Sequence, residues 1–175
     1  MTRVFQIVVA VAVSSASLRV AAQQRPNFSG EWANVPEQAP GVGGPAVGTM
    51  GSGWGTPLTI TQTANLLTVQ YEFFVRGDLQ PPLSFRFALD GSETINTVLM
   101  GRGTQKQTSA TIWNGNTLVI TTKHDFAHPT TGAPTVSETR QALTLQSPTT
   151  LLVETTRVGV LGGPTSTSKT VLTKR

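Results

Sequence analysis

The sequence contains no cysteine, and only 13% of its 175 residues are charged. Without cysteine the chain can form no disulfide, no thiolate metal site and no lipid linkage through sulfur, so its core alone must stabilise it. No lysine or arginine cluster is interleaved with aromatic residues, which argues against a nucleic-acid-binding surface. The net charge of +4 includes Arg3 and Arg19, so the chain beyond residue 22 is close to neutral.

Long apolar runs are also scarce, and the clearest one lies at the N-terminus. Arg3 precedes an apolar stretch over residues 4–13, and Val20-Ala21-Ala22 ends a short polar stretch before Gln23. This order of charge, apolar run and small residues is typical of a secretory signal peptide. The run has about ten residues, whereas a membrane-spanning helix needs roughly 20. We therefore expect residues 1–22 to be a signal peptide, not a membrane anchor or a buried helix.

Export follows from that expectation. The mature protein is expected in the periplasm or outside the cell, with no stable membrane insertion after cleavage.

Signatures of common enzymes are missing as well. The chain has no Gly-x-Ser-x-Gly elbow, no phosphate-binding loop and no dinucleotide fingerprint. Its only histidines are His124 and His128, and residues four apart in an extended strand are expected about 13 Å from each other. They could share zinc or copper with Asp125 only if the chain turned between them, and a hydrated loop histidine is the simpler interpretation. We expect no enzymatic activity, metal or cofactor; a metal-dependent enzyme is the third hypothesis.

The residues that are abundant predict an all-β protein. Thr and Val are frequent, and Gly and Pro punctuate the chain throughout, which favours strands and turns. Residues 23–175 suit a single domain. After a first strand at 28–35, residues 36–55 are rich in Gly and Pro and lack periodicity, which predicts a flexible loop. Its Trp54 is interpreted either as a lid over a cavity or as a side chain packed on the nearest barrel surface.

From residue 57 onward, short runs of alternating polarity are separated by turn residues at a spacing of about 8–12 residues, as in an antiparallel meander. Together with the first strand this gives about ten strands, and closing the sheet hides its edges. The predicted fold is an antiparallel meander barrel of about 8–10 strands. The later strands are expected at residues 57–63, 66–75, 83–89, 93–100, 104–113, 117–126, 135–146, 151–158 and 168–173.

Matching apolar faces predicts the strand registers, because a slip of one residue moves every side chain to the opposite face. The hairpins at 64–65, 90–92, 114–116 and 146–150 then have loops of two, three, three and five residues. The hairpin at 64–65 is then expected to pair Ile60 with Val69, and the hairpin at 90–92 to pair Phe87 with Ile95. The hairpin at 114–116 is expected to pair Ile112 with Leu118 and Ala110 with Ile120, and the hairpin at 146–150 to pair Leu143 with Val153.

These registers predict an interior that is apolar at one end and polar at the other. The apolar inner face comprises Leu58, Ile60, Leu67, Val69, Tyr71, Phe73, Phe85, Phe87, Ile95, Ala110, Ile112, Leu118, Ile120, Leu143, Leu145, Leu151 and Val153. The polar inward positions are Thr97, Thr108, Thr122, His124, Thr139, Gln141, Thr155 and Arg157.

Such an interior has room for a small ligand. The best hypothesis is that the protein binds an amphipathic or hydrophobic molecule, with a carboxylate held by His124 and Arg157. The residues expected to bind it are Tyr71, Phe85, Phe87, Ile120, His124 and Arg157. The plain alternative is a hydrated barrel mouth in which His124 and Arg157 reach solvent. The second functional hypothesis is a structural or interaction protein of the cell envelope that uses its Thr-rich outer face or the loop at 36–55.

The first strand resembles that of a known family. Gly30-Glu31-Trp32 is similar to the Gly-x-Trp of lipocalins, in which the tryptophan closes the barrel floor. The longer motif Pro26–Trp32, with Leu58–Gln62, Leu89–Gly91 and Trp113–Ile120, resembles a group of uncharacterised secreted bacterial proteins with a lipocalin-like barrel. The resemblance covers most of the chain after residue 22. It implies a lipocalin-like fold with Trp32 as the barrel-closing residue.

The sequence also departs from true lipocalins. It has no cysteine pair, no Thr-Asp-Tyr-type motif and no helix pattern after the last strands. The arginine that covers the tryptophan in lipocalins has two candidates here, Arg157 and Arg175. Ligand binding is therefore implied less firmly than the fold.

Overall fold

The chain forms an all-β structure, as its composition predicts. The computed structural model describes residues 25–34, 54, 57–71, 83–100, 103–128, 130–159 and 163–175, which contain ten strands and no helix. The strands are β1 (Gly30–Asn34), β2 (Leu58–Gln62), β3 (Leu66–Tyr71), β4 (Leu83–Ala88), β5 (Thr94–Met100), β6 (Gly103–Asn114), β7 (Thr117–Ala127), β8 (Pro134–Ser147), β9 (Thr150–Arg157) and β10 (Ser166–Lys174). The predicted signal peptide at 1–22 and the predicted loop at 36–55, except Trp54, lie outside the described residues. No helix in the described part is long and apolar enough to cross a membrane.

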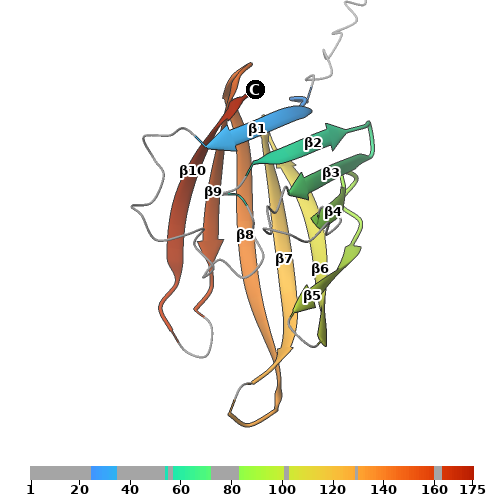
Figure 1. Ribbon diagram of the computed structural model, residues 1–175, viewed down its shortest axis with the longest axis vertical. Helices are drawn as coiled ribbons and strands as arrows, with labels where there is room; N and C mark the ends of the chain where they lie inside the picture. Colours follow the sequence, from blue (N-terminus) through green and yellow to red (C-terminus); the bar gives the residue numbers. More distant parts are fainter. Residues whose placement is uncertain are drawn as a thin grey trace, which may run out of the picture.

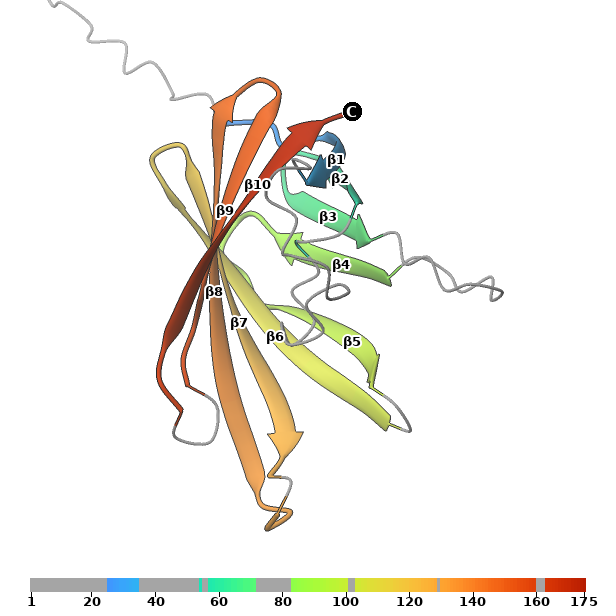
Figure 2. The ribbon, with the colours of Figure 1, turned by 60° about the vertical axis from the view of Figure 1, so that its left-hand side comes forward.

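The strands build one sheet that curls into a nearly closed barrel (Figure 1). Its order is β4-β3-β2-β1-β10-β9-β8-β7-β6-β5, and each strand pairs antiparallel with its neighbours in this order. The pairing of β1 with β10 joins the two ends of the described chain, and β4 and β5 are left as the two ends of the sheet. Figure 2 shows the long strands β6–β10 as one curved wall, with the short strands β1–β4 beside it.

Two of the four predicted registers are confirmed. Ile60 lies opposite Val69 in the β2–β3 hairpin, and Leu143 lies opposite Val153 in the β8–β9 hairpin. The inner positions of these strands are buried and alternate with more exposed outer positions. Strong alternation on both strands leaves one register that buries the apolar set, which is why the sequence pattern predicts it correctly.

The register predicted for the β6–β7 hairpin is wrong by one residue. Gly115, with φ of +58°, and Asn116 form a two-residue turn, and Ile112 therefore lies opposite Val119. The two-residue turn matches the twist of the flanking strands, and a positive φ is readily adopted by glycine. Ile112 is 66% exposed on the outer face, and Ala110 lies on that face with it. The inner positions of β6 from Gln105 to Thr111 are consequently polar.

The pairing predicted between β4 and β5 is also wrong, because no ladder joins the described residues of these strands. Asp90 accepts hydrogen bonds from the backbone N and the Oγ of Ser92, and β5 then pairs with β6 alone. Ile95, expected opposite Phe87, is 56% exposed. Thr97 and Thr108, expected inside, share the outer face with it, because both strands are shifted by one residue from the prediction.

The remaining apolar positions form the core as predicted, apart from Phe73, which lies outside the described residues. Trp32 is fully buried at one end of this core, and its Nε1 donates a hydrogen bond to the carbonyl of Phe28 at 2.9 Å. The cation over its ring is Lys174, whose Nζ lies 5.6 Å from the ring centroid. A cation over an indole ring stabilises the contact electrostatically. Neither Arg157 nor Arg175, the two candidates from the sequence, occupies this position.

The glycine before Trp32 is favoured by its backbone conformation, and it lies against the same lysine. Gly30 has φ of +148°, and a Cβ built there would lie 2.3 Å from Cε of Lys174. Glycine adopts this φ without strain, whereas the flexible end of Lys174 could move away from a Cβ. The Gly-x-Trp motif thus has a local structural explanation in the approach of Lys174 to Trp32.

Candidate functional site

Polar side chains cover the inner face of β6–β9 toward one end of the barrel. The registers align them in cross-strand rows, from Leu118–Leu143–Val153 through Ile120–Gln141–Thr155 and Ser109–Thr122–Thr139–Arg157 to Gln107–His124–Ser137. We use "polar rows" for Gln107, Ser109, Thr122, His124, Ser137, Thr139, Gln141, Thr155 and Arg157. All are buried except Arg157, which is half-buried. The polarity gradient predicted from the sequence is therefore present.

Two members of the polar rows, Gln107 and Ser109, were not expected inside. The predicted register placed them on the outer face, and Gln105 and Thr111 of the same strand are also buried. The alternation of Gln105, Gln107, Ser109 and Thr111 with Lys106 and Thr108 carries no apolar signal. The Gly-Asn turn at 115–116 is the one sequence feature that could have located them.

His124 is the most distinctive member of the polar rows. It is 4% exposed, and its Nε2 lies 3.1 Å from Oγ1 of Thr139 on the neighbouring strand. Its Nδ1 is buried and has no hydrogen-bond partner among the described residues. Burial, and secondarily the positive charge of Arg157, lower the pKa of His124, while Asp125 acts weakly in the opposite direction. The imidazole is therefore neutral at neutral pH.

Arg157 is the only cation on the polar rows. It ends β9 opposite Thr139, and burial lowers the pKa of its guanidinium, which nevertheless keeps its charge at any physiological pH. The acidic residues of the surrounding strands, Asp125, Glu138 and Glu154, lie on the outer face, where Glu154 pairs with Lys169 at 2.7 Å. Among the described residues of β7, β8 and β9, the inner face at this end of the barrel therefore carries the positive charge of Arg157 and no carboxylate.

Most hydroxyls and amides of the polar rows are hydrogen-bonded in pairs. Oγ of Ser109 lies 2.8 Å from Oγ1 of Thr122, and Nε2 of Gln107 donates to Oε1 of Gln105 at 3.3 Å. Oγ of Ser137 is buried without a hydrogen-bond partner among the described residues, like Nδ1 of His124. These two residues lie directly opposite each other on β7 and β8. Buried polar atoms normally have partners, so this pair can receive a polar group from outside the chain.

The predicted aromatic contacts lie on the other side of the barrel, on β3 and β4. Tyr71 meets Phe85 edge-on with centroids 5.6 Å apart, and Phe85 stacks on Phe87 at 6.4 Å. Trp54 lies edge-on to Tyr71 at 6.1 Å and is buried. Because Tyr71 points inward, Trp54 covers an interior residue; burial also raises the pKa of Tyr71, which stays a neutral phenol.

The structure therefore groups the six predicted ligand residues in two sets. Tyr71, Phe85 and Phe87 form one aromatic cluster, in which the rings contact each other. The second set comprises Ile120, His124 and Arg157 on β7 and β9, with Ile120 two rows from His124 toward the apolar end.

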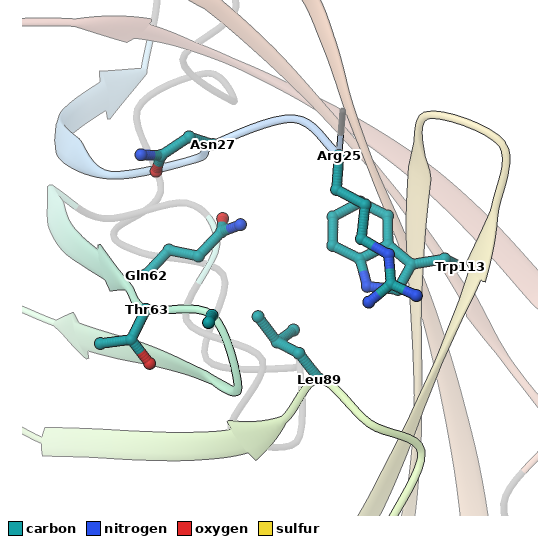
Figure 3. A pocket seen from close by; sticks show the side chains of 7 residues that line it. Arg25, Asn27, Gln62, Thr63, Leu89 and Trp113 are labelled. Carbon is teal, nitrogen blue, oxygen red and sulfur yellow. The ribbon is translucent and has the colours of Figure 1, made fainter. Parts of the chain in front are cut away.

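A separate depression of about 470 Å³ lies near the end of the barrel where the described chain begins (Figure 3). It is lined by Arg25, Asn27, Gln62, Thr63, Ala64, Leu89 and Trp113. The guanidinium of Arg25 lies 5.3 Å from the centroid of the Trp113 ring, which also stacks on Phe28. The amide of Gln62 accepts from the backbone N of Phe28 and donates to the carbonyl of Pro26. These contacts tie residues 25–28 across the barrel end.

The second histidine takes part in a turn. Nδ1 of His128 accepts hydrogen bonds from the backbone N of Thr130 and Thr131 at 3.2 and 3.3 Å. Among the described residues, no three His, Asp or Glu side chains converge on a position for a metal ion.

Comparison with known proteins assigns no family to this chain. No protein-family model matches it, and no curated protein sequence is significantly similar to it.

Proposed function

We propose that this chain is exported and binds a small amphipathic anion, such as a long-chain carboxylate, inside its barrel. The observation that carries the proposal is the pair of buried atoms Nδ1 of His124 and Oγ of Ser137, which lie on facing residues next to the positive charge of Arg157.

The chemistry of the polar rows suits a carboxylate. In the proposed complex the Thr139 hydroxyl donates to Nε2 of His124, so the ring proton sits on Nδ1 and can be donated to the ligand. The Ser137 hydroxyl supplies a second donor and the guanidinium of Arg157 a charged one. Hydrogen bonds to an ionised oxygen are about twice as strong as neutral ones, and more so away from water.

The apolar part of the ligand is expected to run toward the apolar end of the barrel. Ile120 is the first fully buried aliphatic side chain in that direction, and the row of Leu118, Leu143 and Val153 follows. The aromatic cluster of Tyr71, Phe85 and Phe87 is well packed and would form a wall.

The outer face offers less support for an envelope interaction protein. Threonine hydroxyls there bond to each other, as between Thr117 and Thr144 at 2.9 Å. Among the described residues, the exposed large apolar ones are Ile95, Ile112, Val136 and Val158, which belong to different strands or follow one. Scattered single apolar residues are ordinary on a protein surface, whereas an interaction site is marked by a contiguous patch.

The first test asks whether the protein carries or takes up such a ligand. Native mass spectrometry of the secreted protein after desalting should detect a bound small molecule. Fluorescence titration with dansyl-undecanoic acid should be saturable, and its methyl ester should bind at least tenfold more weakly. A protein that carries nothing and shows no saturable binding contradicts the proposal and favours the interaction hypothesis.

The second test asks whether the anion is held at the polar rows. Arg157→Gln removes the inward charge, and the loss of one charged hydrogen bond should weaken binding of the acid about tenfold or more. Arg140→Gln is the matched control, because Arg140 is exposed on the outer face of β8. Equal affinities in the two variants would place the anion elsewhere.

A further inference from the structure

The junction between β4 and β5 differs from the nine others in the barrel. Each of the nine is a backbone ladder, and that between β7 and β8 pairs eleven residues. In the described part of the chain, side chains of β5 and β6 instead bond to the backbone of β4. The contacts are Arg86 N to Asn96 Oδ1 at 2.8 Å, Asn96 Nδ2 to Arg86 O at 3.0 Å, Ala88 N to Thr94 Oγ1 at 2.9 Å, and Thr111 Oγ1 to Ala88 O. We call this junction the seam.

Asn96 is the central contact of the seam. Its amide oxygen and amide nitrogen bind both backbone groups of Arg86, as a residue of a neighbouring strand would do. Because a side chain takes the place of backbone, β5 is held away from β4 by the length of that side chain. Opening the seam frees backbone groups that water can bind, so it costs less than opening a ladder of many residues.

The seam is also next to the polar rows. Asn96 lies opposite Gln107 on β6, and Gln107 lies opposite His124 on β7. Gln107 and His124 are only 3% and 4% exposed. A ligand therefore cannot reach them unless part of the surrounding structure moves, and among the described strands the seam is the junction beside them that lacks a backbone ladder.

We propose that the seam opens as a local unit and is the route by which a ligand reaches the polar rows, with Asn96 as its latch. The proposal rests on the proposed function for its ligand, but the opening of the seam is measurable without one. Thr94 and Thr111 secure the seam toward the turn at Asp90, so the opening is expected to begin on the side of Asn96 away from that turn.

Amide hydrogen exchange of the whole mature protein tests the opening itself. The amides of Arg86 and Ala88 should exchange faster than those of the β7–β8 ladder. Asn96→Ala should accelerate exchange at Arg86 about tenfold or more, and Thr97→Ala, its outward neighbour, should leave it unchanged. Thr94→Val is a second, milder variant that should accelerate exchange at Ala88. Seam amides as slow as the ladder, and unaltered in both seam variants, would overturn the proposal.

Stopped-flow binding of dansyl-undecanoic acid tests the route. Asn96→Ala should raise the association and dissociation rate constants together by about tenfold, with Kd within about threefold of the wild type. The two rates change together because Asn96 closes the route and is not proposed to contact the bound ligand. Thr97→Ala should match the wild type. If the probe binds and Asn96→Ala changes neither rate, the seam is not the route. If the wild type binds no probe, the proposed function fails and the route with it, while exchange still reports separately whether the seam opens.

Discussion

The same substitution at two positions tests which side chains of β6 and β7 face the interior of the barrel. Ile112 and Ile120 belong to the same hairpin, but Ile112 is 66% exposed on the outer face and Ile120 is fully buried on the inner face. Replacement of each by alanine removes the same atoms. The difference between the two losses of stability therefore measures burial alone.

The expected magnitudes are well separated. Ile112 keeps about a third of its side chain from water, and full burial of an isoleucine contributes about 1.5–3 kcal/mol, so Ile112→Ala should cost about 0.5–1 kcal/mol. Ile120 lies in a row between Thr111 and Gln141, where paired strands on both sides hinder collapse of a cavity. Ile120→Ala should therefore cost about 3–4 kcal/mol, within the range measured for buried aliphatic residues.

Urea unfolding followed by tryptophan fluorescence and by circular dichroism gives both values, and coincidence of the two probes checks two-state behaviour. A loss of more than about 2 kcal/mol for Ile112→Ala would refute the register, because that size of effect requires a buried side chain. Nearly equal losses for the two variants would do the same.

Two further predictions concern His124 and Gly30. The pKa of His124 is lowered in the folded protein by burial and by Arg157, so below the unfolded-state pKa of about 6.5 the unfolded chain takes up a proton more readily. The free energy of unfolding should consequently fall as the pH decreases through about 6.5. His124→Asn should flatten this dependence in urea titrations, and an unchanged slope contradicts the prediction. Gly30→Ala should destabilise by about 1–3 kcal/mol, because of its φ of +148° and the collision of the new Cβ with Lys174. Lys174→Ala in the same chain should recover part of this loss, and strictly additive effects would show that the collision is unimportant.

Much of the fold is predictable from the sequence because most strands alternate strongly. Where both strands of a hairpin carry apolar residues at every second position, as at Ile60–Val69 and Leu143–Val153, burial selects one register. The Gly-x-Trp motif singles out Trp32, which is buried, but it does not identify Lys174 as the side chain over the ring, because that contact depends on how β10 meets β1.

The β6 error has a physical cause that links it to the candidate site. Matching apolar faces assumes that the interior is apolar, but β6 turns Gln107 and Ser109 inward and leaves Ile112 outside. A chain selected only for stability would gain by the opposite choice, since burying amides and hydroxyls yields less free energy than burying isoleucine. The same shift in β5 turns Asn96 inward, where it closes the seam.

A rule of patterning that fails on two adjacent strands, both times in favour of buried polar groups, indicates that these positions serve something other than the core. The polar rows and the seam are the two features that result. They meet where Asn96 of the seam lies opposite Gln107 of the polar rows. The predicted polarity gradient is present, although the residues predicted for it on β5 and β6, Thr97 and Thr108, lie on the outer face. The gradient came from β7, β8 and β9, whose registers near His124 and Arg157 are set by apolar residues farther along the same strands. On β5 and β6 the inner positions are mostly polar, so hydrophobic patterning cannot show which way they face, and for β6 the two-residue turn at Gly115 and Asn116 sets the register.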